Sequence, residues 1–96
     1  MITRIFRVEI VPSLRGEFEP LFQTVSVESV QGADGFIRLD IGRPTDETPN
    51  EYMMISVWES EESLIKYVGP NWTEAHIPSG MKNFVVQCWV HHFREF

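Results

Sequence analysis

The chain has 96 residues, of which 43% are hydrophobic and 23% are charged, and this size and balance predict one globular domain spanning residues 1–96. Eight Lys and Arg residues against 14 Asp and Glu residues give a net charge of −6, with the basic residues scattered along the chain. Because nucleic-acid binding requires grouped basic residues, these numbers exclude that class of partner and favour a small, largely apolar ligand.

Two further features concern the location of the protein and the chemistry of its cysteine. No apolar run approaches the ~18 residues of a membrane span, and no signal peptide precedes the first predicted strand, so we expect a cytoplasmic protein without a membrane partner. Cys88 is the single cysteine, which excludes an intrachain disulfide and a cysteine metal cluster. Its apolar neighbours predict a buried, unreactive thiol.

The first half of the chain predicts a strand, a helix and a second strand. The segment 2–11 alternates with period two, which is typical of a strand, and Pro12 ends it. Ser13 is placed to cap a helix, in which Pro20 predicts a kink or the start of the regular part. The apolar stripe of this helix follows 3.6-residue spacing and consists of Leu14, Phe18, Leu21, Phe22, Val25 and Ser29. A turn at 32–35 leads to a strand at 36–43, with Ile37, Leu39 and Ile41 on one face.

The second half predicts a hairpin, a short helix and a final strand. A polar loop at 44–50 joins the strand at 36–43 to a third strand at 51–59. Ser60 is a candidate N-cap, and Glu61 and Glu62 then suit the first helical turn. Gly69 and Pro70 end this helix, and a broken segment leads to a long strand at 83–93.

The order of these elements predicts the fold class. A β-α-β-β-α-β chain of this length fits an α+β, ferredoxin-like sandwich, in which a four-stranded antiparallel sheet carries two helices on one face. The strands at 51–59 and 83–93 are apolar on both sides, so the helix-free face would leave apolar surface in water. We therefore expect a homodimer that covers this face with a second copy of the sheet, giving a dimeric α+β barrel.

Sequence motifs add a family resemblance. The segment DGFIRLDIGRP, the VWES-x-ES-x-x-x-Y block from Val57 to Tyr67 and the following W-x-x-A-H from Trp72 to His76 resemble the antibiotic biosynthesis monooxygenase (ABM) domain. The resemblance covers nearly the whole chain. It implies dimeric α+β barrels that pair their sheets back to back.

Two kinds of family member bear on function. The cofactor-free aromatic oxygenases resemble this chain at Trp58, which matches their active-site tryptophan, whereas Met54 and Leu64 stand where they carry asparagine and tyrosine. The haem-degrading members resemble it at Tyr67, where they carry tryptophan, and at His76, which matches their haem-ligating histidine. The resemblance thus implies either oxygenation without a cofactor or haem as the cofactor.

The candidate catalytic residues are His76 and Trp58. Histidine side chains titrate near neutral pH, so His76 is the best proton acceptor in its region, although a structural hydrogen-bonding role is the commoner one for a lone histidine. It follows Trp72 by four residues, which would put both on one face of a helical turn. Trp58 ends a strand, where a tryptophan usually fills the core, but it could also stack against a planar ring.

The candidate substrate-binding residues are Met54, Tyr67, Trp72 and Arg38, with the aromatic and sulfur side chains as pocket walls. Arg4 or Arg38, if turned inward, could stabilise a developing phenolate or enolate. His91 and His92 are adjacent in a strand and point to opposite faces, so we expect no metal site.

Together with these residues, the resemblance implies a cofactor-independent monooxygenase that oxidises a small quinol- or anthrone-like aromatic with O2. Two alternatives stay open. One is a non-catalytic dimer that binds a small hydrophobic molecule, and the replacement of asparagine and tyrosine by Met54 and Leu64 favours it. The other is a haem-binding or haem-degrading protein.

Overall fold

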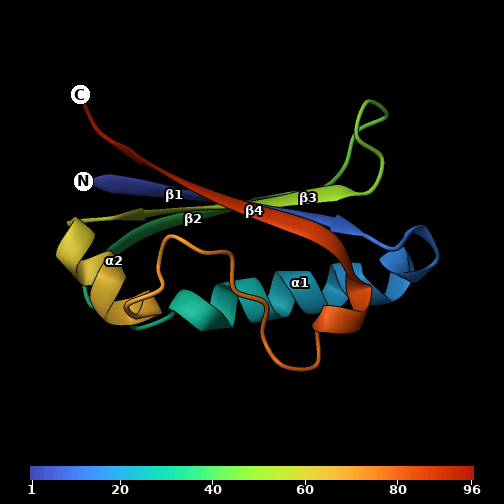
Figure 1. Ribbon diagram of the computed structural model, residues 1–96, viewed down its shortest axis with the longest axis horizontal. Coiled ribbons are helices and arrows are strands. Elements are labelled where there is room, and N and C mark those ends of the chain that lie inside the picture. Colours follow the sequence, from blue (N-terminus) through green and yellow to red (C-terminus); the bar gives the residue numbers. More distant parts are fainter.

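The computed structural model describes all residues from 1 to 96. Its elements follow in the predicted order, as Figure 1 shows. They are β1 (Ile2–Ile10), a short 3-10 turn, α1 (Arg15–Val30), β2 (Phe36–Gly42), β3 (Glu51–Trp58), α2 (Glu61–Val68), a second 3-10 turn and β4 (Val85–Arg94). The strand and helix boundaries predicted from the sequence are therefore correct to within two residues.

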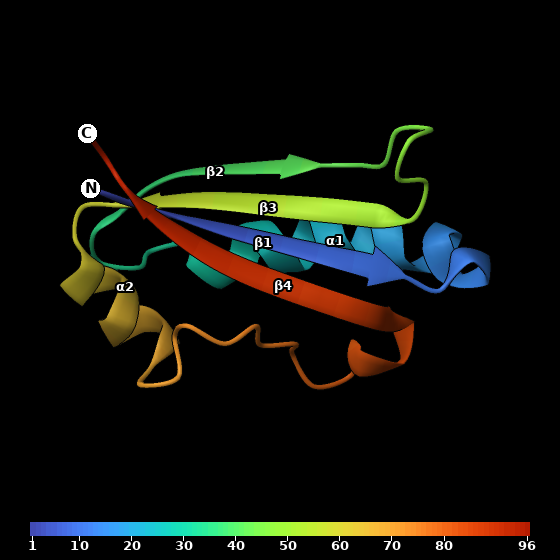
Figure 2. The ribbon, with the colours of Figure 1, turned by 45° about the horizontal axis from the view of Figure 1, so that its top comes forward.

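The four strands form one antiparallel sheet in the order β2-β3-β1-β4. Both helices lie on the same face of this sheet, and the two termini lie together at one end (Figures 1 and 2). The ferredoxin-like α+β class predicted from the sequence is confirmed. The segment between α2 and β4 runs along the helix-bearing side of the sheet beside α1 (Figure 1).

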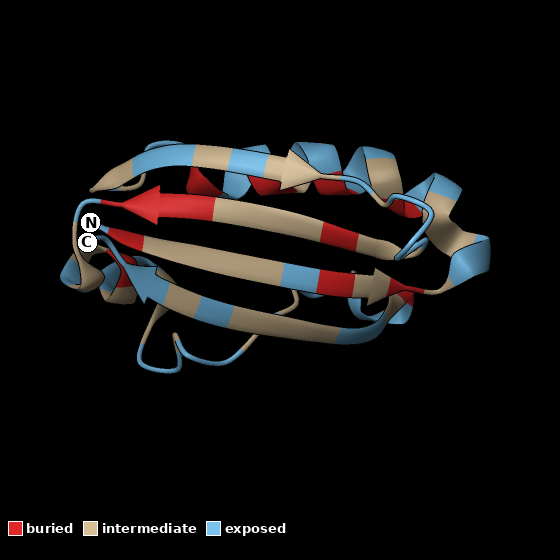
Figure 3. Cartoon of the chain, turned by 90° about the horizontal axis from the view of Figure 1, so that it is seen from above, coloured by how far each residue is buried: buried red, intermediate tan, exposed pale blue.

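The strand register separates two faces. The register pairs Arg4 with Ser56 and Phe6 with Met54, and between them it pairs Ile5 with Ile55. Because successive side chains of a strand point to opposite faces, the even-numbered residues of β1 and β3 share one face, which is the face toward the helices. Figure 3 views the sheet from its helix-free side and shows that the residues of the central strands are intermediate to buried, whereas those of the outer strands are more exposed.

The core consists of two clusters beneath the helices. One contains Val8, Phe18, Phe22 and Tyr52, in which Phe18 and Phe22 stack with ring centroids 5.2 Å apart. The other contains Ile2, Val30, Trp58 and Leu64. The two clusters lie toward opposite ends of the sheet, and the partly buried Met54 packs against both of them.

Three local predictions about the helices have different outcomes. Ser60 caps α2 as expected, because its hydroxyl accepts a hydrogen bond from the backbone N–H of Ser63 at 3.1 Å. Ser13 does not cap α1; it lies in the 3-10 turn Pro12–Leu14, and no side chain caps this end. Pro20 does not mark the start of α1, which begins five residues earlier at Arg15.

The buried stripe of α1 also differs from the prediction. Its buried residues are Phe18, Phe22, Ser26 and Val30, whereas Leu21 is 43% exposed. The stripe therefore recurs every four residues rather than every 3.6, and this brings a serine to the inner face. This serine, Ser26, lines the cavity described below, which is why a polar side chain is found on the inner face.

The predicted face of Ile37 is wrong for a similar local reason. The pairing of β2 with β3 shifts between Phe36 and Arg38, a β-bulge that leaves Ile37 unpaired and 47% exposed. Leu39 and Ile41 keep the predicted inner face, since they pair with Ser56 and Met54. Neither helix is long and apolar enough to cross a membrane.

Candidate functional site

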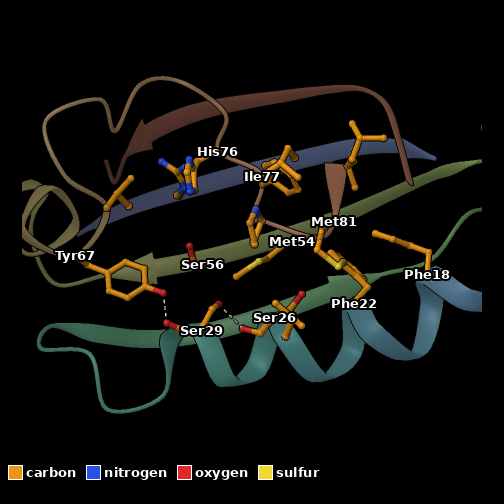
Figure 4. A pocket seen from close by; sticks show the side chains of 17 residues that line it. Phe18, Phe22, Ser26, Ser29, Met54, Ser56, Tyr67, His76, Ile77 and Met81 are labelled. Atoms are coloured by element: carbon orange, nitrogen blue, oxygen red, sulfur yellow. Dashed lines mark hydrogen bonds between the residues drawn. The ribbon is translucent and has the colours of Figure 1, made fainter. Parts of the chain in front are cut away.

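A cavity of about 420 Å³ lies between the helix-bearing face of the sheet, α1 and the segment that precedes β4. This volume falls in the lower part of the ~300–1,000 Å³ range of small-molecule sites. Eleven of its 17 lining residues are hydrophobic. Figure 4 shows Phe18 and Phe22 of α1 and Met81 toward one end of it, and Met54 of β3 near its middle. The wall therefore suits an apolar, ring-sized ligand with few polar groups.

Six polar side chains interrupt this apolar wall: Arg4, Ser26, Ser29, Ser56, Tyr67 and His76. They come from β1, α1, β3, α2 and the segment before β4, so the site exists only once the sheet has closed against the helices. None of the lining residues is Asp or Glu. The cavity is consequently positive in an otherwise acidic protein.

Arg4 has the most constrained position among these polar groups. Its Nη1 donates to the backbone oxygen of Trp72 at 2.6 Å and lies 2.9 Å from Nε2 of His92. Burial lowers the pKa of the Arg4 guanidinium from its ordinary value, but an arginine remains charged at neutral pH. The structure thus turns Arg4 inward, which is one of the two possibilities considered from the sequence.

His92 supports Arg4 from β4. Because a guanidinium has only donors, Nε2 of His92 must accept this hydrogen bond and is unprotonated. Burial, followed by the positive charge of Arg4, lowers the pKa of His92, with Glu61 opposing the shift. The His92 ring also meets Trp72 edge-on, with centroids 4.6 Å apart. Sequence reasoning placed His92 opposite His91 but gave it no role.

Ser26, Ser29 and Tyr67 form a second polar group in the cavity lining, on the helices rather than on the sheet. The hydroxyl of Tyr67 donates to the backbone oxygen of Ser29, and the hydroxyl of Ser29 donates to the backbone oxygen of Ser26 at 2.8 Å (Figure 4). These bonds occupy backbone carbonyls of α1 near its C-terminal end. They join α2 to α1 along the edge of the cavity.

Trp58 lies behind this site rather than in it. Its side chain is 1% exposed, and its indole N–H donates to the hydroxyl of Ser56 at 3.0 Å. Tyr67 and Phe36 pack against its ring, with centroids 4.9 and 5.6 Å away. Ser56 and Tyr67 line the cavity, whereas Trp58 does not. Trp58 therefore reaches the site through neighbouring side chains rather than directly.

The other predicted site residues divide into two groups. Met54, Tyr67 and His76 line the same cavity, and His76 is also exposed to solvent. Trp72 does not line it, but its backbone oxygen holds Arg4. Arg38 lies on the other face of the sheet, 65% exposed and paired with Asp40 at 3.0 Å, so the structure does not bring it to the cavity.

Two further residues clarify the local geometry. Leu64, at the position of the tyrosine of the aromatic oxygenases, is fully buried in the core. The residues from Pro70 to Thr73 form a turn, and the chain at His76 is not helical, so the predicted helical turn shared by Trp72 and His76 is wrong. No group of three or more His, Cys, Asp or Glu side chains is arranged to hold a metal ion.

The fold and the cavity together define a ferredoxin-like α+β protein with an apolar cavity between its sheet and helices. Residues 1–76 match the family described as antibiotic biosynthesis monooxygenase, and the chain belongs to this family. No curated protein matches the sequence.

Solved structures share the fold at low sequence identity. SnoaB of Streptomyces nogalater, a cofactor-independent oxygenase, is 20% identical, with a TM-score of 0.72 over 98% of this chain and 91% of its own. The haem degrader MhuD of Mycobacterium tuberculosis, with two haems bound in its active site, is 19% identical, with a TM-score of 0.73 over 99% and 95%. A candidate antibiotic biosynthesis monooxygenase from Deinococcus radiodurans is 12% identical, with a TM-score of 0.77 over 100% and 93%. At these identities the similarity establishes the fold.

Proposed function

We propose that the protein is a cofactor-independent monooxygenase that oxidises a small quinol- or anthrone-like aromatic with O2. One observation carries the proposal: an apolar cavity of ring-accommodating size has an imidazole and a guanidinium in its lining, those of His76 and Arg4. The likeness to SnoaB, a cofactor-independent oxygenase, supports it at the level of the fold.

The chemistry follows from these two groups. His76, which is exposed as well as cavity-lining, takes a proton from the substrate and can exchange it with solvent. The Arg4 charge favours an anionic substrate inside the apolar wall. This electron-rich anion gives one electron to O2, and the substrate radical and superoxide combine into a peroxide anion, which takes the proton back.

The peroxide then collapses to product. For an anthrone-like CH2 group, loss of the remaining C–H proton and cleavage of the O–O bond form a carbonyl and release the second oxygen atom as water. The carbon loses two hydrogens and gains one oxygen, so one O2 is consumed per substrate. The apolar lining excludes water from the anion and the radical pair.

Oxygen consumption tests this proposal directly. With dithranol or a naphthoquinol as substrate, we expect protein-dependent O2 uptake that falls roughly 100-fold or more in His76→Ala, as is typical when a general base is lost. The matched control is His91→Ala, because His91 is a histidine that does not line the cavity. Equal rates in both variants would remove His76 from the mechanism. A protein that binds these aromatics without uptake would be the non-catalytic binder.

Haem binding is a second candidate, favoured by the placement of His76 on an apolar cavity wall. The imidazole of His76 would hold the haem iron, and the haem would supply the oxygen chemistry when bound. Titration with haem should then give a Soret band that is lost in His76→Ala and kept in His91→Ala. The absence of a band at micromolar haem would eliminate this candidate.

We also propose that two copies pair through their helix-free sheet faces. This face carries Ile5, Met53, Ile55 and Trp89, which the register places on one side. Burial of apolar area contributes about 25 cal/mol per Å², so covering such a face favours association. Sedimentation at micromolar concentration should give twice the chain mass of 11.2 kDa. A monomer at that concentration would contradict the pairing.

A further inference from the structure

Half of the Arg4 guanidinium has no partner within the protein. Both hydrogen bonds of its side chain use Nη1, one to the backbone oxygen of Trp72 and one to His92. Nε and Nη2 make none, although the residue is half-buried and lines the cavity. These two nitrogens form one edge of the planar group, which is the edge that matches the two oxygens of a carboxylate.

Arg4 also lacks a negatively charged partner. Most of the other cationic side chains have one, in the pairs Arg7–Glu51, Arg38–Asp40, Arg43–Glu19, Lys66–Asp34 and Arg94–Glu61. The chain has 14 acidic residues, yet none of them lines the cavity. A partly buried cation without a counter-charge is costly, and this cost falls if a ligand supplies the charge.

We infer that the cavity selects an aromatic ligand that carries a carboxylate, bound by the Nε–Nη2 edge of Arg4. The inference rests on the proposed function in placing an aromatic ring in this cavity, and it names the class of substrate: an aromatic acid. The apolar wall from Phe6 and Met54 to Ile77 takes the ring. The Arg4 edge then fixes its orientation.

His92 and the Trp72 carbonyl are positioning groups for this contact. They occupy both N–H groups of Nη1, so the guanidinium plane cannot turn without breaking two hydrogen bonds. Their bonds come from β4 and from the segment before it, on the side away from the free edge. A preorganised donor pair of this kind binds two-oxygen anions more tightly than a mobile side chain does.

The test measures binding rather than turnover. Calorimetric titration at pH 7.5 compares naphthoate with naphthalenemethanol and naphthol, which have the same ring but are neutral at that pH. A charged, two-point hydrogen bond predicts that naphthoate binds roughly 10- to 100-fold more tightly than either neutral ligand. Equal affinities for naphthoate and a neutral ligand would overturn the inference.

Variants assign the preference to Arg4. We expect Arg4→Gln to abolish it, and Arg43→Gln, which removes the same charge from an exposed position outside the cavity, to keep it. A preference that survives in Arg4→Gln would overturn the inference. Should Arg4→Gln fail to fold, Arg4→Lys keeps the charge without the two-point edge, so the preference should fall at least about threefold; an unchanged preference would count against the assigned edge.

The positioning role of His92 has its own readout. His92→Gln retains an acceptor oxygen for Nη1, whereas His92→Phe does not, so the first should keep the naphthoate preference and the second should lose most of it. Affinity for naphthalenemethanol should be the same in both, and a difference there would mean that His92 shapes the cavity instead. Naphthoate has no oxidisable phenol or activated CH2, so its binding is independent of whether the protein consumes O2.

Discussion

The variant Trp58→Phe separates a structural role of this tryptophan from a catalytic one. Trp58 is 1% exposed, its N–H donates to Ser56, and it does not line the cavity. The substitution removes two ring carbons and one N–H. Each buried carbon contributes ~0.8 kcal/mol and the net hydrogen bond about 1 kcal/mol, so we expect the free energy of unfolding to fall by roughly 2–3 kcal/mol.

Two measurements test this expectation. Urea unfolding followed by circular dichroism gives the loss of stability, which corresponds to a fall in Tm of roughly 10–20 °C for a domain of this size. Titration with a cavity ligand below the unfolding transition should give the affinity of the parent protein. Trp72→Phe is the matched control, because Trp72 is half-buried and its indole donates no recorded hydrogen bond; it should cost less than about 1 kcal/mol. A Trp58→Phe protein of unchanged stability that no longer binds ligand would refute the core assignment.

Three further predictions concern stability and reactivity. Burial lowers the pKa of His92 below the ordinary 6.5, so below about pH 6.5 the unfolded chain binds a proton that the folded chain does not. The free energy of unfolding should therefore fall as the pH falls through that range. In urea titrations at several pH values, His92→Gln should show a smaller loss. Ser60→Ala should cost about 1 kcal/mol in urea unfolding because it removes the cap of α2, whereas Ser13→Ala should cost little; equal losses would contradict the cap. Burial raises the pKa of the Cys88 thiol, so at pH 8 it should react with a disulfide reagent more slowly than the same cysteine in urea, and equal rates would argue against this environment.

The strand pattern of the sequence predicts much of the site, including the direction of Arg4, which we considered as inward or exposed without choosing between them. Period two in β1 places Ile2, Phe6, Val8 and Ile10 on the inner face, and position 4 shares that parity. The inward direction of Arg4 could therefore be read from the alternation alone, as could the outward direction of Arg38, which alternates with Leu39 and Ile41.

Other parts of the site could not be predicted because no local pattern encodes them. The segment from Gly69 to Lys82 has no hydrophobic period, and its path beside α1 places His76 and the Trp72 carbonyl at the cavity. Likewise, Ser26 lies on the inner face of α1 beside the cavity, and a serine within a helical stripe does not by itself predict a cavity there. Both depend on contacts between residues far apart in sequence.

The alternation along β3 means that one stretch of eight residues serves two surfaces. Met54 and Ser56 line the cavity, while Met53 and Ile55 belong to the helix-free face. Deleting or inserting a single residue in this strand would exchange the two sets, turning Met53 and Ile55 inward and the cavity-lining pair outward. A substitution at one of these four positions therefore affects one surface, whereas a change in the length of β3 by one residue would damage the cavity and the outer surface together.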